Sequence, residues 1–168
     1  KNVVTAVTAD HNLQGIRHYA ETDVLSQFLI PFFILGPETI IKNPRIISSF
    51  GSHVDIAPTL IELTTFNTSY LSFGKSLLSD GQKTCVVNQN GFLFSNEFVL
   101  HYDYPNGPFH GLYQWKSPNR WELDRIDNLD ETEKLLDAMT AYYSVASYYL
   151  EEEWDKKSPT IANKKGNK

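Results

Sequence analysis

The chain has 168 residues, of which 41% are hydrophobic and 21% charged, and its formal net charge is −5. These values are typical of a globular protein large enough to bury a core, and they exclude the basic surface used to bind nucleic acid. The longest apolar run, residues 28–35, contains a proline and is too short to span a bilayer. The single cysteine, Cys85, excludes an internal disulfide and a cysteine-rich zinc site.

The first half of the chain has the element order of an α/β protein. The β-branched run over residues 3–9 predicts a strand buried on both faces, and the polar residues 12–24 predict a loop. Residues 31–37 end in Gly-Pro and predict a second buried strand, and residues 52–63 predict a helix capped by Asp55. Because the chain begins inside a strand, we expect it to be the C-terminal part of a longer protein.

The second half changes character after about residue 80. Short β-rich runs between residues 85 and 123 are separated by turns, and Asn90-Gly91 is a strong hairpin signal, so we expect a small antiparallel sheet. Asp130 and Glu133 indicate a capping box at the start of a long helix. The apolar stripe of that helix contains Leu135, Met139, Tyr142, Ala146 and Tyr149. The basic tail from Lys156 is expected to be disordered.

The dipeptide Asp10-His11 follows the first predicted strand at its carboxyl end, where α/β sheets bind ligands. A carboxylate and an imidazole are both ligands for divalent metals. Adjacent residues on a regular strand point to opposite faces, so the chain must leave β geometry here if both are to reach one ion. The alternative is an aspartate that caps the next turn beside a surface histidine.

Other candidate residues are less informative. Arg17 and His18 lie in the following loop, where they could bind an anion or simply be solvated. His53 precedes the predicted helix, where it could face an anion or pack against the cap. His101 and His110 lie among aromatic residues of the predicted sheet, and we interpret both as structural. The chain contains no nucleophile signature and no Gly-rich phosphate-binding loop.

Three segments follow one another along the chain: Thr8-Ala9-Asp10-His11, residues 30–37 (Ile-Pro-Phe-Phe-Ile-Leu-Gly-Pro) and residues 52–60 (Ser-His-Val-Asp-Ile-Ala-Pro-Thr-Leu). In this order they resemble the C-terminal half of the sulfatase family, which belongs to the alkaline phosphatase superfamily. Residues 74–78 and the aromatic segment 141–150 are similar to the lipoteichoic-acid-synthase and phosphoglycerol-transferase branch. The resemblance covers about residues 3–150.

The resemblance implies an α/β sandwich around a largely parallel sheet, followed by a small antiparallel subdomain and a terminal helix. Residues 1–80 would then be part of the catalytic domain, residues 81–154 the subdomain and residues 155–168 a disordered tail. Asp10 and His11 match the family's ligands for a divalent metal, with Mn²⁺ expected first and Mg²⁺, Zn²⁺ or Ca²⁺ as alternatives. His18, Arg17 and His53 would be substrate-binding residues. The nucleophile and the other ligands would lie upstream, so this chain alone is expected to be inactive.

The function implied is transfer or hydrolysis of a phosphoryl group, of the phosphoglycerol or phosphoethanolamine type. The substrate would be an anionic phosphate or sulfate ester, including lipid-linked ones, and no nucleic acid would bind. The protein would act on the extracytoplasmic face of the bacterial inner membrane, attached through upstream segments. One alternative is a sulfate-ester hydrolase. Another is a non-catalytic module in which the aromatic-rich residues 84–124 bind a glycan or a partner and Asp10-His11 is vestigial.

Overall fold

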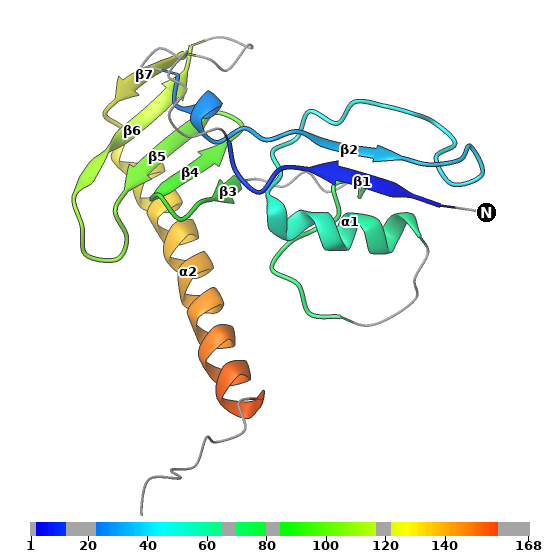
Figure 1. Ribbon diagram of the computed structural model, residues 1–168. Coiled ribbons are helices and arrows are strands. Elements are labelled where there is room, and N and C mark those ends of the chain that lie inside the picture. The colour runs from blue at the N-terminus through cyan, green and yellow to red at the C-terminus, as the bar shows by residue number, and fades with distance from the viewer. Residues whose placement is uncertain (1–2, 13–22, 65–69, 80–84, 117–121, 158–168) are drawn as a thin grey trace, which may run out of the picture.

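The part of the chain that the structure describes is mixed α/β, with two antiparallel sheets, a short α-helix and a long α-helix towards its C-terminal end (Figure 1). The computed structural model describes residues 3–12, 23–64, 70–79, 85–116 and 122–157, with side chains as far as Glu151. The elements are β1 (Thr5–Thr8), η1 (Leu25–Gln27), β2 (Phe32–Leu35), η2 (His53–Asp55), α1 (Ile56–Leu63), β3 (Cys85–Val87), β4 (Phe92–Ser95), β5 (Phe98–Tyr102), β6 (Phe109–Trp115), β7 (Leu123–Ile126) and α2 (Leu129–Lys157).

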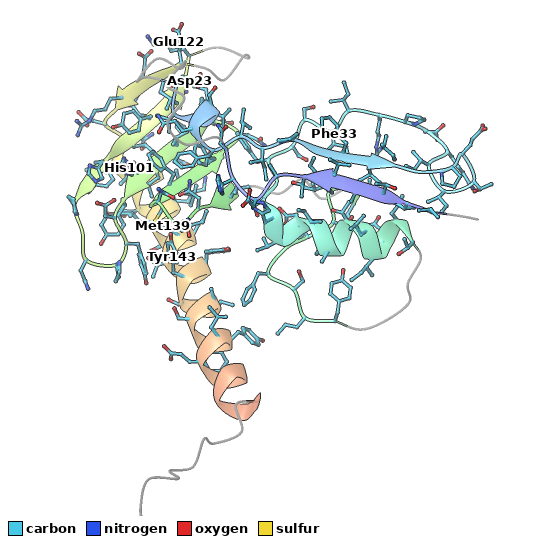
Figure 2. The ribbon with its side chains drawn as sticks, in the orientation of Figure 1. Asp23, Phe33, His101, Glu122, Met139 and Tyr143 are labelled. Atoms are coloured by element: carbon cyan, nitrogen blue, oxygen red, sulfur yellow. The ribbon has the colours of Figure 1, made fainter. Side chains whose placement is uncertain are left out.

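Strands β1 and β2 form a separate two-stranded sheet. They pair antiparallel, with Thr5 opposite Leu35 and Thr8 opposite Phe32. All four residues of β1 are exposed. On β2, Phe33, which Figure 2 labels, is 58% exposed and Leu35 is 61% exposed. The expectations of a largely parallel sheet and of a strand buried on both faces are therefore wrong for the described residues. An apolar, β-branched run predicts strand conformation, but it does not determine which layers of the protein cover that strand.

The second sheet contains β3 to β7 in chain order, each strand antiparallel to the next, as predicted for the second half of the chain. The predicted turn at Asn90-Gly91 joins β3 to β4. The Asn88 side chain accepts hydrogen bonds from the backbone N–H groups of Asn90 and Phe92. Gly91 has a φ of 78°, a conformation that favours glycine and explains the residue at this position.

Helix α2 confirms the predicted long helix but begins before the expected capping box. It starts at Leu129, and the Asn128 side chain accepts a hydrogen bond from the backbone N–H of Glu131 at 3.1 Å. Asn128 therefore satisfies a free N–H group of the first turn, the role predicted for Asp130. The helix continues to Lys157, past the predicted start of the tail, and residues 158–168 lie outside the described part. Among the described residues, no helix has the length and apolarity needed to cross a membrane.

The core lies on both faces of the five-stranded sheet. On one face, side chains from β4, β5 and β6 pack against α2: Leu93, Leu100 and Leu112 against Leu135 and Met139. On the other face, Phe94 and Val99 pack with Leu25 of η1, and Phe28 and Phe50 add to this cluster. Residues that precede the sheet by more than 30 positions thus cover one of its faces. The division of the chain near residue 80 stays a prediction.

Met139 tests the packing of α2 on the sheet, because its side chain is fully buried (Figure 2). We expect Met139→Ala to lower the free energy of unfolding by about 2–5 kcal/mol through lost burial and a residual cavity. Urea unfolding followed by circular dichroism measures this change. Leu150→Ala is the matched control on the same helix, since Leu150 is 65% exposed. It should change stability by less than about 0.5 kcal/mol. Equal effects of the two variants would contradict the described packing.

Candidate functional site

Asp10 and His11 lie immediately beyond the end of β1, where the chain leaves strand geometry as predicted. The Asp10 carboxylate accepts a hydrogen bond from the His11 backbone N–H at 2.9 Å, and its other oxygen lies 3.4 Å from His11 Nε2. The Asp10 and His11 side chains are 88% and 63% exposed. The structure therefore brings a carboxylate oxygen and an imidazole nitrogen together on the surface, and both are open to an ion.

The turn that carries Asp10 and His11 is tied to the rest of the protein at two points, Asn12 and Ala9, and has one further contact within itself. His11 Nδ1 lies 2.7 Å from the carbonyl oxygen of Asn12, and the Asn12 side chain donates a hydrogen bond to the carbonyl of Ser26 in η1. His53 Nε2 lies 2.8 Å from the carbonyl oxygen of Ala9. Because a carbonyl only accepts, Nε2 is the protonated nitrogen of His53. His53 thus holds the end of β1 in place from the start of η2.

The structure describes only one of the three predicted substrate-binding residues, His53. Arg17 and His18 lie outside the described residues, so their role stays a prediction. His53 is near Asp10, but its Nε2 atom is engaged by the backbone of Ala9. Within the described part of the chain, no third histidine, cysteine or carboxylate joins Asp10 and His11 in a cluster of ligand atoms. That Asp10 and His11 are two ligands of a metal centre therefore stays a prediction.

A buried carboxylate supports the element behind this turn. Asp55 has no exposed surface and accepts hydrogen bonds from the backbone N–H and the hydroxyl of Ser52, at 2.8 and 3.3 Å. Its other oxygen accepts from the backbone N–H of Lys75 at 2.8 Å. The buried Thr59 hydroxyl accepts from the backbone N–H of Leu77 at 3.0 Å. Two segments that carry the family resemblance, residues 52–60 and 74–78, therefore bind each other directly.

A second group of potential ligands lies on the five-stranded sheet, where the sequence predicts a structural role for His101 and His110. His110 Nε2 lies 3.1 Å from one oxygen of Asp103, and His101 Nε2 lies 3.7 Å from the other. One potential ligand atom from each residue lies within 4.8 Å of the others. Burial lowers the pKa of His101, as does the neighbouring His110, whereas Asp103 acts in the opposite direction. The pairing of β5 with β6 creates this group, and the sequence spacing did not reveal it.

Comparison with known proteins gives one partial similarity. Over 71 residues, 42% of this chain, the sequence is 34% identical to a protein of Bacillus subtilis (strain 168) named lipoteichoic acid synthase-like YvgJ. The matched stretch is 12% of that protein's length. No protein-family model matches the chain, and no solved structure matches it. The similarity supports kinship with the lipoteichoic-acid-synthase branch over part of the chain.

Gly74 tests the contact between the two resembling segments. A Cβ atom on Gly74 would lie 1.9 Å from the carbonyl oxygen of Val54, so the backbone of one segment would have to move. We expect Gly74→Ala to lower the free energy of unfolding by about 3 kcal/mol, the upper range for overpacking. Thermal and urea unfolding measure the effect.

Gly36→Ala is the matched control for Gly74→Ala. The atoms nearest to its new Cβ atom would belong to the side chains of Ile41 and Val4, at 3.2 and 3.4 Å, and these can move. We expect a change below about 1 kcal/mol. If Gly74→Ala were as well tolerated as Gly36→Ala, the close approach of residues 74–78 to η2 would be wrong.

Proposed function

We propose that this chain contributes Asp10 and His11 as two ligands of a divalent metal in a larger, sulfatase-like phosphoryl transferase. The observation that carries the proposal is the exposed carboxylate–imidazole pair, held at a strand end within a sequence partly similar to a lipoteichoic acid synthase-like protein. Mn²⁺ is the ion we propose first, because the resemblance to the sulfatase family implies it and a carboxylate oxygen such as that of Asp10 suits it. When bound, a divalent metal stabilises negative charge that develops on a phosphoryl group.

The chain's own residues would hold and orient that ion. Asp10 and His11 would each provide one ligand atom to the ion from adjacent positions. The hydrogen bonds of Asn12 and His53 restrict movement of the backbone that carries them. Such supporting contacts tune affinity, because a ligand that is already oriented loses less entropy on binding. Arg17 and His18 are proposed to contact the anionic group of the substrate.

The exposed apolar side chains of the sheet formed by β1 and β2 are a reason to propose that this chain packs against further protein. Val7 on β1 and Phe33 and Leu35 on β2 are 45%, 58% and 61% exposed, an apolar surface that would gain stability by packing against further protein. We propose that the rest of a sulfatase-like domain covers it and supplies the nucleophile and remaining ligands. The substrate would be a phosphoglycerol- or phosphoethanolamine-bearing ester, including a lipid-linked one, on the extracytoplasmic face of the bacterial inner membrane.

The test uses the full-length protein with Asp10→Ala and His11→Ala. We expect both variants to lose bound Mn²⁺, measured by elemental analysis after dialysis. We also expect turnover of a chromogenic phosphodiester to fall at least about 100-fold, because metal stabilisation is worth several kcal/mol. Asp137→Ala, an exposed carboxylate on α2, is the control and should change neither value. Unchanged metal content with an intact fold would refute the proposal and favour a non-catalytic module. Preference for the matching sulfate ester would identify a sulfatase.

His53 tests the supporting role separately. His53→Ala removes the hydrogen bond to Ala9, so we expect about a tenfold loss of Mn²⁺ affinity, the lower range for an outer-shell change. His53→Gln should recover most of the affinity, because its amide can donate to the same carbonyl. Calorimetric titration with Mn²⁺ measures both. A loss as complete as that of His11→Ala, without recovery in His53→Gln, would instead make His53 a metal ligand.

A further inference from the structure

A β-bulge brings two histidines to the same place on the five-stranded sheet. Along β5 and β6, His101 pairs with Gly111, but the next residue, Tyr102, pairs with Phe109. His110 is therefore the extra residue of the bulge, and bulges re-aim side chains. Its ring stacks on His101 with centroids 4.0 Å apart and planes 18° apart. Gly111 has a φ of 152°, which favours glycine at the bulge.

The position of the third group, Asp103, is defined by its backbone. Its N–H donates to the carbonyl of Pro108 at 3.2 Å, and its carbonyl accepts from the N–H of Gly107 at 2.7 Å. These bonds close the loop between β5 and β6 and fix the backbone that carries the carboxylate. One oxygen lies 3.1 Å from His110 Nε2 and the other 3.7 Å from His101 Nε2.

The ring of His101 is also held from its other side. Phe92 on β4 stacks on it with centroids 3.9 Å apart and planes 14° apart. Phe92 in turn stacks on Phe94, which stacks on Phe50, so His101 and His110 end an aromatic row across this face. His101 lies on the sheet face opposite to Met139, which packs on the other side (Figure 2). The rigid row fixes one ligand, while the more exposed His110 and Asp103 side chains can adjust.

We propose that His101, Asp103 and His110 form a second metal site, which takes a borderline first-row divalent ion such as Zn²⁺. Two imidazoles and a carboxylate are a ligand set that Zn²⁺ uses, with bonds of about 2.0–2.2 Å. The three ligand atoms lie within 4.8 Å of one another, and the exposed His110 ring would turn out of its stack on His101 so that the in-plane nitrogen lone pairs of both rings meet at one ion. The remaining coordination positions face solvent, since His110 and Asp103 are partly exposed. The bound ion would cross-link β5, its loop and β6.

The test separates this site from the proposed catalytic half-site. Tag-free protein with Asp10→Ala and His11→Ala is titrated calorimetrically with Zn²⁺, and in parallel with Co²⁺, whose visible absorption reports ligation. We expect one saturable Zn²⁺ ion per chain and a rise in Tm, because the ion binds only the folded hairpin. This result would stand even if the Asp10-His11 proposal failed.

Three further variants in that background identify the ligands. Asp103→Asn, His110→Gln and His101→Gln should each weaken Zn²⁺ binding at least tenfold and remove the Tm rise. Asp127→Asn, an exposed carboxylate just beyond the same sheet, should bind as the parent does. Near-ultraviolet circular dichroism checks the fold, and His110→Gln keeps the test valid if His101→Gln disturbs the aromatic row. The proposal would be refuted if Zn²⁺ binding were not saturable, or if Asp103→Asn and His110→Gln left it unchanged. The three residues would then form only an imidazole–carboxylate hydrogen-bond network.

Discussion

The five-stranded sheet carries apolar side chains on both faces, and both faces must be covered for it to be stable. Val99 and Leu100 are neighbours on β5, point to opposite faces and are both fully buried. Full burial of each side chain stabilises the fold by about 1.5–3 kcal/mol. Exposure of either face to solvent would therefore destabilise the protein. Helix α2 covers one face, and Leu25, Phe28 and Phe50 cover the other. The second face thus depends on residues from the first half of the chain.

Residues of η1 connect this buried face of the sheet to the candidate site. Leu25 is buried in the cluster on the sheet, and the next residue, Ser26, accepts the hydrogen bond from Asn12. Asn12 follows directly after Asp10 and His11, so the exposed pair is tied to the larger core by a short series of contacts. His53 provides a second attachment through Ala9. An exposed carboxylate–imidazole pair gains a defined orientation from such anchors, which is what preorganised binding would require.

The two groups of metal-compatible side chains are built on different principles. Asp10 and His11 are adjacent in sequence and come together because the strand ends. His101, Asp103 and His110 come together because two strands pair and one of them bulges. The first group is open and incomplete within the described chain, as a shared centre would be. The second draws all its groups from one hairpin, where stacking on Phe92 holds His101 and the more exposed His110 and Asp103 side chains can adjust.

The sequence by itself determined the features that depend on local chemistry. The Asn90-Gly91 turn, the stripe of Leu135 and Met139 on α2, and the departure from strand geometry at Asp10 follow from backbone conformation and side-chain periodicity. Asn128 displaced the predicted cap because several polar residues near a helix start can satisfy the same N–H groups. Only the tertiary structure decided that β1 is exposed, that Phe50 covers the sheet, and that His101 meets His110. Those outcomes depend on which surfaces pack together and on strand register, and a local pattern of residues specifies neither.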